Sequence, residues 1–275
     1  MTGETSWVPS EVDTSVPNPA RVYDFWLDGD HNFAADRALG EQILKIMPGI
    51  RDAARLNRAF LRRAARHMVD AGIRQFLDVG AGIPTVGNLH EIVQQADPSC
   101  RVVYVDREPV AVAHSELLLQ DNDRCAVIQA DLRDVDEIFA GAGKLLDPGQ
   151  PTGLFMLLLL HFVPDSWDPV SILARYRERL APGSFLALTH VAADTESATE
   201  LGEAVQVYTT QQNQQNQPFP RTHEEVLRFF DGFELVEPGL VGCALWNPEG
   251  AGDMSDDPAI NVLPYAGVGR KPDSP

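Results

Sequence analysis

The hydrophobic positions of the chain change their spacing near residue 72. Before it, apolar residues recur with the period of an amphipathic helix, and a long helix is predicted to end at Gly72. After it, short runs of β-branched and aromatic residues alternate with helical stretches. We therefore predict an N-terminal helical part, with helices over 19–27, 33–46 and 52–71, followed by an α/β core.

The core is predicted to be a doubly wound, mostly parallel sheet of seven strands, because strands alternate with helices. The run Leu154–Leu160 is apolar at successive positions, so it is predicted to be a central strand covered on both faces. The last two strands are expected at 233–241 and 260–268. The other strands are predicted near 75–79, 101–105, 126–130 and 185–190, and the helices near 87–96, 109–119 and 170–180.

The chain divides into three parts, of which residues 1–15 are expected to be disordered. Residues 16–71 form a helical cap, and residues 72–272 form a Rossmann-like core. An insertion at about 196–222 precedes a capping box, Thr222-His-Glu-Glu225, which predicts the start of a helix. A helix and loop placed there would overhang the carboxyl edge of the sheet as a lid.

Composition narrows the range of partners. The 275-residue chain, 44% of it hydrophobic, is long enough for one α/β domain with decoration. Its 40 acidic and 22 basic residues give a formal charge of −18, which argues against nucleic acid, because nucleic-acid binders need a basic footprint. The three cysteines are odd in number and lack metal-ligand spacing, so we expect no metal site and a reducing, cytoplasmic setting. The longest apolar run is too short to span a bilayer, so no membrane partner is expected, and the sequence leaves a homodimer open.

A glycine turn follows the first predicted strand. In the segment Asp78-Val-Gly80-Ala81-Gly82 a buried strand breaks into a turn that leads to a helix. In an open parallel sheet such a turn lies outside the carboxyl end of the strand, where small ligands bind, and glycine lets the backbone approach the ligand. The next strand ends at Asp106, which Arg107 follows. A carboxylate at that strand end is suited to accept two hydrogen bonds from ribose hydroxyls.

The residues around the turn favour S-adenosylmethionine over a nicotinamide dinucleotide. A dinucleotide fingerprint requires a third glycine, where this chain has Thr85. Asp78 stands ahead of the turn, where it would repel a pyrophosphate and attract the sulfonium and ammonium groups of S-adenosylmethionine. The third strand leads to Asp131 and Leu132, which could accept a hydrogen bond from the adenine amino group and pack against the ring.

With these motifs the chain resembles the class I S-adenosylmethionine-dependent methyltransferases. The segments that narrow this to an actinobacterial family formerly labelled a domain of unknown function are Pro19–Gly29, Asn32–Arg37, Asn57–Arg63 and Gly72–Asp78. The resemblance covers nearly the whole chain and implies a sheet whose final strand is antiparallel. It also implies that the insertion before the sixth strand closes over the methyl acceptor, whose identity it leaves open.

The N-terminal segment Tyr23–Phe33 has two interpretations. Its aromatic residues could pack against the sheet as an ordinary helix, or, as the resemblance implies, the segment could fold over the cofactor as a lid. In the second case Tyr23 would face the sulfonium through a cation–π contact, and Asn32 or Arg58 would bind the amino-acid end.

Methyl transfer needs few catalytic side chains, because most of the rate acceleration comes from in-line positioning and exclusion of water. A general base is needed only for a hydroxyl or a protonated amine. His161, which follows the fourth predicted strand, is the candidate base. His190 and His31 are alternatives, and each of the three could instead be a polar residue satisfied by backbone.

Three functions remain open on sequence alone. The leading one is an enzyme, a cytoplasmic methyltransferase that moves the methyl group of S-adenosylmethionine to a small molecule. The second is an S-adenosylmethionine-binding protein without turnover, a sensor or partner subunit, because binding and catalysis share the same cofactor motifs. The third is a nicotinamide-dependent oxidoreductase, against which Thr85 and Asp78 count.

Overall fold

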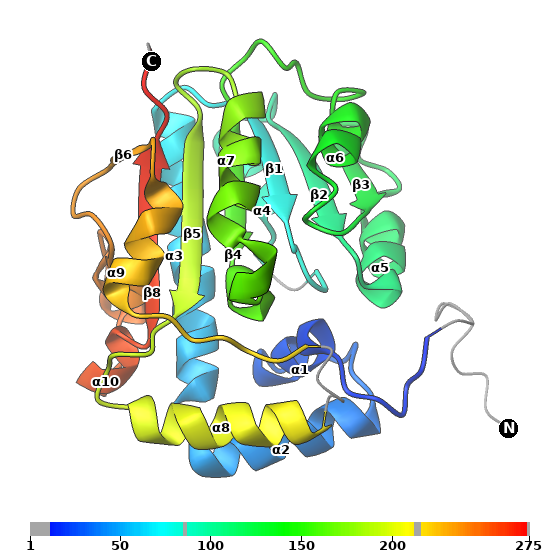
Figure 1. Cartoon of the computed structure of the whole chain (residues 1–275). Coiled ribbons are helices and arrows are strands. Elements are labelled where there is room, and N and C mark those ends of the chain that lie inside the picture. Colours follow the sequence, from blue (N-terminus) through cyan, green and yellow to red (C-terminus); the bar gives the residue numbers. More distant parts are fainter. Residues whose placement is uncertain (1–11, 85–86, 212–215, 274–275) are drawn as a thin grey trace, which may run out of the picture.

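The computed structural model describes residues 12–84, 87–211 and 216–273, and a mixed β-sheet forms its middle layer (Figure 1). The continuous strand order is β3-β2-β1-β4-β5-β8-β6, and the short strand β7 pairs with β8. The strands are β1 (Gln75–Val79), β2 (Arg101–Asp106), β3 (Cys125–Gln129), β4 (Gly153–Leu157), β5 (Phe185–Val191), β6 (Glu234–Leu235), β7 (Val241–Gly242) and β8 (Pro264–Arg270). Strands β1 to β5 are parallel, and β8 is antiparallel to its neighbours. The predicted doubly wound, mostly parallel sheet of seven strands is confirmed, with β7 as a two-residue addition.

Helices cover both faces of the sheet. The described helices are α1 (Pro19–Trp26), α2 (Ala34–Ile46), α3 (Ile50–Asp70), α4 (Leu89–Ala96), α5 (Pro109–Leu119), α6 (Val135–Ala142), α7 (Pro169–Arg179), α8 (Ala198–Gln211), α9 (His223–Leu227) and α10 (Pro258–Asn261). Side chains of α3 and α4 pack on one face, and side chains of α6, α7 and α9 pack on the other. In Figure 1, α7 lies in front of the sheet and α3 lies behind it. None of the described helices is long and apolar enough to cross a membrane.

The packing follows from the periodicity of the sequence. Along α3, Phe60, Ala64 and Met68 are spaced by four residues and are fully buried, as expected for one stripe of an amphipathic helix. Gly72 follows the helix with φ +94°, a left-handed conformation that favours glycine and ends the helix where predicted. All residues of β1 are buried, because a central parallel strand is covered on both faces.

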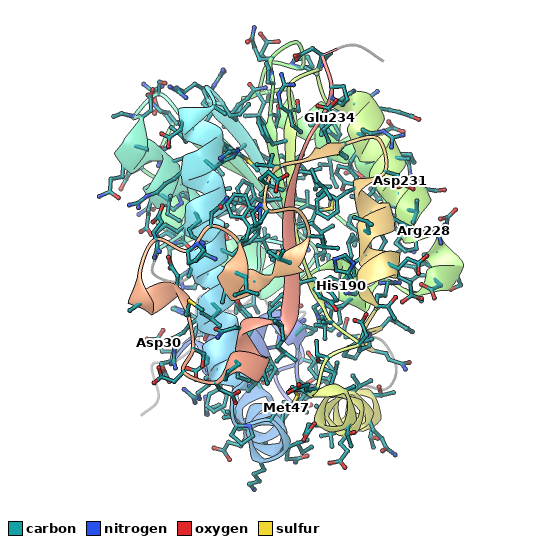
Figure 2. The ribbon with its side chains drawn as sticks, turned by 90° about the vertical axis from the view of Figure 1, so that its left-hand side faces the viewer. Asp30, Met47, His190, Arg228, Asp231 and Glu234 are labelled. Atoms are coloured by element: carbon teal, nitrogen blue, oxygen red, sulfur yellow. The ribbon has the colours of Figure 1, made fainter. Side chains whose placement is uncertain are left out.

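Of the predicted cap, residues 16–71, helix α3 packs on a face of the sheet, whereas α1 and α2 lie with α8 at the carboxyl ends of the parallel strands; these three helices are called the cap below. Helices α1, α2 and α8 are placed below the strand ends in Figure 1, and the view in Figure 2 shows Met47, just after α2, beside the same edge. Buried side chains of α2, α3 and α8 form one apolar cluster there. The strand order reverses between β1 and β4, so the cap covers the point where open α/β sheets bind ligands.

Four details of the sequence prediction were wrong. The predicted strand 154–160 ends at Leu157, because Leu158 adopts φ +47° and residues 160–162 form a 3₁₀ turn. The final strand starts at Pro264 instead of residue 260, because residues 258–261 form α10. The sixth strand is only Glu234–Leu235, and helix α6 was not predicted.

Two further predictions concern residues 1–15 and the capping box at Thr222. The disorder expected for residues 1–15 falls mostly on residues 1–11, which lie outside the described residues. Within residues 12–15, Ser15 donates hydrogen bonds to the Asp13 carboxylate from both its backbone and its hydroxyl. The predicted capping box is confirmed, since the Thr222 side chain accepts from the backbone N–H of Glu225 at the start of α9.

Candidate active site

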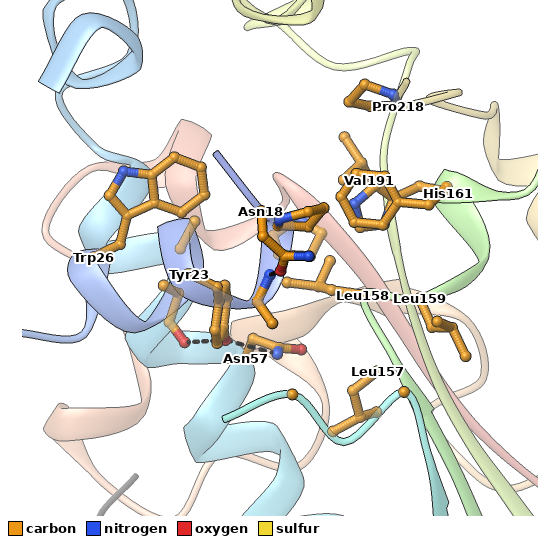
Figure 3. A pocket seen from close by; sticks show the side chains of 18 of the residues that line it. Asn18, Tyr23, Trp26, Asn57, Leu157, Leu158, Leu159, His161, Val191 and Pro218 are labelled. Atoms are coloured by element: carbon orange, nitrogen blue, oxygen red, sulfur yellow. Dashed lines mark hydrogen bonds between the residues drawn. The ribbon is translucent and has the colours of Figure 1, made fainter. Parts of the chain in front are cut away.

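A cavity of about 260 Å³ lies between the carboxyl ends of the strands and the cap. Its lining comes from α1, α2 and α3, the turn after β1, the ends of β2, β4 and β5, and α8. Figure 3 shows side chains of the cap and of the strand ends converging on it. One cavity thus joins the predicted glycine turn to the predicted lid.

The glycine turn is tied to the end of β2. The backbone N–H groups of Gly80 and Ala81 donate to the carbonyl oxygen of Val105, at 2.8 and 3.2 Å. Gly80 has φ +72°, a left-handed conformation that favours glycine, and a Cβ there would lie 2.5 Å from the Leu159 side chain, which would have to move. Gly82 has φ +68° and would meet nothing within 4 Å, which leaves open space beside the turn.

Asp106 lies at the end of β2 and lines the cavity. One of its carboxylate oxygens accepts from the backbone N–H of Gly82 at 2.7 Å, and the other accepts from that of Glu108 at 2.9 Å. Burial raises the pKa of this carboxyl, although both hydrogen bonds oppose the shift. Each oxygen retains a second lone pair, so the oriented carboxylate can accept the two hydroxyls of a ribose.

Asp78 is a buried carboxylate that faces the same cavity. Burial raises the pKa of Asp78 to about 7, Arg58 lowers it, and Asp106 raises it further. Among the described residues no cation forms an ion pair with Asp78, and the nearby Arg58 donates to the carbonyl oxygen of Gly87 at 2.6 Å. A desolvated carboxylate of this kind is stabilised by a ligand that brings its own positive charge.

A buried chain of hydrogen bonds connects the cap to the end of β4. The Tyr23 hydroxyl donates to the carbonyl oxygen of Ala54 at 3.1 Å and accepts from the Asn57 amide at 2.9 Å (Figure 3). The Asn57 oxygen accepts from the Thr189 hydroxyl at 2.7 Å. The Thr189 hydroxyl in turn accepts from the backbone N–H of Leu158 at 2.9 Å. Desolvation raises the pKa of Tyr23 to about 12, so this hydroxyl keeps its proton.

This chain of hydrogen bonds holds a strained turn at the cavity wall. Leu158 has φ +47°, a conformation that costs a branched residue roughly 1–3 kcal/mol. Its N–H is also bonded to the Thr189 carbonyl oxygen at 3.1 Å, so two acceptors fix the turn. Sequence reasoning gave no role to Thr189 or Leu158. The signal it could have used is a polar residue, Asn57, at an apolar position of the α3 stripe.

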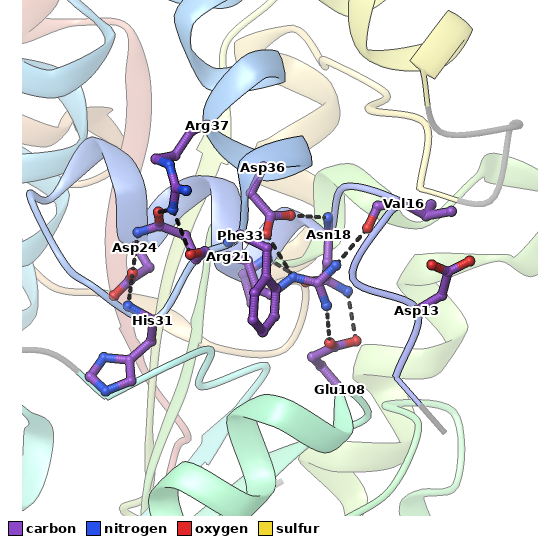
Figure 4. Close-up of polar contacts among 12 residues, drawn as sticks. Asp13, Val16, Asn18, Arg21, Asp24, His31, Phe33, Asp36, Arg37 and Glu108 are labelled. Carbon is purple, nitrogen blue, oxygen red and sulfur yellow. Dashed lines mark hydrogen bonds and ion pairs between the residues drawn. The ribbon is translucent and has the colours of Figure 1, made fainter. Parts of the chain in front are cut away.

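A second network fastens the N-terminal segment to the residue two positions after Asp106 (Figure 4). Arg21 donates to Asp36 at 2.9 Å and to Glu108 at 2.7 Å, and its side chain is almost fully buried. The Asn18 amide donates to the other Glu108 oxygen at 2.7 Å. The cap is therefore attached to the strand end that carries the predicted ribose ligand.

Two predicted cofactor residues lie outside the cavity lining. Asn32 is buried, and its amide donates to Asp24 and to the carbonyl oxygen of Gly29, both at 2.8 Å. The carboxylate of Asp131 is held by Arg133, with contacts of 2.8 and 3.1 Å. Both side chains already bond to residues close in sequence. A sequence motif does not show that such partners compete with a ligand. The predicted residues that do line the cavity are Tyr23, Arg58, Asp78, Gly80, Ala81, Gly82, Asp106, Arg107, Leu132 and His161.

The three candidate histidines differ in what their ring nitrogens contact. His161 is 6% exposed and lines the cavity, and its Nδ1 has no hydrogen-bond partner among the described residues. Burial, with His190 and Arg221 adding to it, lowers the pKa of His161 well below its usual value, so the ring is neutral.

His190 and His31 are not part of the lining. His190 accepts from Arg221 through Nε2 at 3.0 Å, so its Nδ1 carries the proton and donates to the Val191 carbonyl oxygen at 2.9 Å. His31 lies edge-to-face against His114, with ring centroids 3.7 Å apart. Of the three, His161 alone combines a place in the described lining with a ring nitrogen that lacks a partner.

Comparison with known proteins identifies the family. The chain matches the family model described as S-adenosyl methyltransferase over residues 5–272. A putative methyltransferase from Thermobifida fusca is 36% identical, with a TM-score of 0.88 over 98% of this chain and 100% of that one. A DUF574 family protein from Streptomyces avermitilis is 37% identical, with a TM-score of 0.89 over 94% of this chain and 99% of that one. A search of the curated proteins finds no match. This chain belongs to the S-adenosyl methyltransferase family, whose members use S-adenosylmethionine as methyl donor.

Proposed function

We propose that the protein transfers the methyl group of S-adenosylmethionine to a small-molecule acceptor by in-line displacement. The observation that carries this proposal is the single cavity that contains the glycine turn, Asp78 and Asp106 at one end and His161 with the cap at the other. A donor bound at the turn would present its methyl group to the same enclosed space. Enclosure excludes water, and positioning of the two reactants supplies most of the acceleration.

The residues at the turn fit the donor. Asp106 has lone pairs left for the ribose hydroxyls, and Leu132 lies where an adenine ring would pack. Asp78 offers the buried negative charge that an ammonium needs. Arg58 is assigned to the donor's carboxylate in place of Asn32, because Arg58 lines the cavity.

The remaining cofactor assignments also use residues that line the cavity. The ring of Tyr23 can face the sulfonium, and Arg107 flanks the ribose end. Asp131 stays with Arg133, so we assign the adenine contact to Leu132 alone. No described group of acidic, histidine or cysteine side chains is arranged to hold a metal, and the proposed reaction uses none.

In the proposed step a lone pair of the acceptor forms the bond to the methyl carbon. The carbon–sulfur bond breaks with its electron pair remaining on sulfur, which gives S-adenosylhomocysteine. If the acceptor atom is a hydroxyl oxygen, its proton passes to the neutral ring of His161. Burial, His190 and Arg221 lower the pKa of His161, so its ring is neutral and has a lone pair that can accept this proton.

The test is calorimetric titration of the purified chain with S-adenosylmethionine, S-adenosylhomocysteine and NAD in parallel. Selective micromolar binding of the two adenosyl-sulfur ligands supports the proposal. Binding of NAD alone would overturn it in favour of an oxidoreductase, and binding of no ligand would remove its basis. Release of S-adenosylhomocysteine in the presence of acceptors then separates an enzyme from a protein that binds without turnover.

A further inference from the structure

The cap side of the cavity is apolar and carries no formal charge among its described lining residues. It is lined by Trp26, Ile43, Met47, Ile50, Phe162, Val191, Leu201, Ala204, Val205, Tyr208, Leu263 and Pro264. The charged side chains of the described lining are Arg58, Asp78, Asp106, Arg107 and Glu108, all at or near the glycine turn. The two sides of the cavity therefore recognise different chemistry. We call them the turn side and the cap side.

Helix α8 presents a continuous stripe to the cap side. Leu201, Ala204, Val205 and Tyr208 are spaced as i, i+3, i+4 and i+7, which places them on one helical face. On the other face, Glu203 is exposed. The stripe meets α2, whose Ile43 belongs to the same apolar cluster.

Aromatic rings give the cap side its shape. Phe162 and Tyr208 lie with ring centroids 6.0 Å apart and planes tilted by 41°. The Trp26 ring is oriented by its N–H, which donates to the Gly40 carbonyl oxygen at 3.3 Å. Flat, rigid walls of this kind favour a flat ligand, because aromatic surfaces stack or meet edge to face.

From these observations we infer that the cap side binds the methyl acceptor, and that the acceptor is an uncharged, mainly apolar molecule with an aromatic ring system and a hydroxyl or neutral amine. This inference rests on the proposed function and specifies its second substrate. A charged acceptor would be buried here without a counter-ion, which is strongly unfavourable. The hydroxyl or amine would approach His161, which lines the same cavity beside Phe162.

The experiment compares three ligands that share the 2-naphthyl ring system on protein saturated with S-adenosylhomocysteine. The probes are 2-naphthol, 2-naphthoate and 2-naphthylmethylammonium, and calorimetry measures each dissociation constant. We expect 2-naphthol to bind at least about tenfold more tightly than either ion, a difference of roughly 1.4 kcal/mol. Equal or tighter binding of either ion would overturn the inference.

A pair of variants on α8 locates the binding. Ala204→Trp fills the cap side from a buried position, and Glu203→Trp adds the same side chain at the neighbouring exposed position as a matched control. We expect Ala204→Trp to abolish 2-naphthol binding and to keep S-adenosylhomocysteine binding, whereas Glu203→Trp should keep both. Thermal unfolding checks that both variants fold.

The outcomes distinguish the two proposals. If the wild-type protein fails to bind S-adenosylhomocysteine, the proposed function is wrong. If it binds S-adenosylhomocysteine and fails to bind 2-naphthol, or if folded Ala204→Trp still binds 2-naphthol, the inference about the acceptor is wrong and the proposed function stands.

Discussion

The turn side and the cap side of the cavity are built in different ways. On the turn side, Gly80, Gly82 and Asp106 come from two adjacent strand ends and are fixed by backbone hydrogen bonds. On the cap side, the lining comes from segments as far apart in sequence as Trp26 and Leu263. Under the proposed assignment, the donor site is thus encoded in short motifs, whereas the acceptor site depends on how separate helices assemble.

The two sides also differ in electrostatics. Asp78 and Asp106 both have their pKa raised by burial, so the turn side holds carboxylates that a cationic ligand would relieve. The cap side is apolar, and His161 at its border is kept neutral by burial. This difference in charge suits a positive donor on the turn side and an uncharged acceptor on the cap side. A substitution on one side should therefore weaken the binding of one ligand and leave the binding of the other unchanged.

The largest expected effect is on the rate of methyl transfer. His161→Gln keeps a hydrogen-bonding side chain but cannot take up a proton, so we expect S-adenosylhomocysteine formation to fall by roughly 10²- to 10⁴-fold. The assay uses a panel of uncharged aromatic alcohols, whose hydroxyl must lose its proton, with wild type and variant. Donor affinity should be unchanged because His161 lies apart from the turn side. A variant as fast as wild type would exclude His161 as the base.

A smaller effect is expected on donor binding. Asp106→Ala removes the proposed ribose contacts and the acceptor of the Gly82 N–H, so affinity for S-adenosylmethionine should fall by about 1.5–3 kcal/mol, or roughly 10- to 150-fold. Calorimetry measures the change. Asp136→Ala, on an exposed carboxylate of α6, is the control. If a folded Asp106→Ala variant kept its affinity, the ribose would have to be placed elsewhere.

The smallest effect depends on pH. The pKa of Asp78 is about 7 in the folded protein and near its ordinary 3.8 when the chain unfolds, so this group lowers stability as pH rises from about 4 to about 7. Asp78→Asn keeps the site neutral and should raise the unfolding temperature of the ligand-free protein above pH 7. The same variant should weaken donor binding by roughly tenfold above pH 7 and by less below it.

Thermal unfolding and calorimetry at pH 6 and pH 8 check both parts of the Asp78 prediction. Asp78→Asn should thus stabilise the empty protein and weaken the complex, a combination that simple misfolding would not produce. Loss of stability together with loss of binding at both pH values would contradict the assignment of Asp78 to a cationic group.

The fold could largely be predicted from periodicity, because each core strand and most helices carry their own apolar pattern. The prediction failed where conformation depends on partners. Leu158 looks like one more residue of an apolar strand, yet hydrogen bonds from its N–H to Thr189 hold it at φ +47° and end β4 early. Helix α6 lies between two elements with clearer apolar patterns and was not predicted. The sixth strand is only two residues long.

The sequence by itself determined the sheet, the glycine turn and the carboxylate at the end of β2, because these features depend on residues close in the chain and on backbone geometry. Tertiary structure decided which side chains reach the cavity. Asn32 and Asp131 are taken up by Asp24 and Arg133, while Asn57 links Tyr23 to Thr189. The apolar cap side also forms only on folding, because α1, α2, α3 and α8 pack their apolar faces against one another and leave a cavity between them.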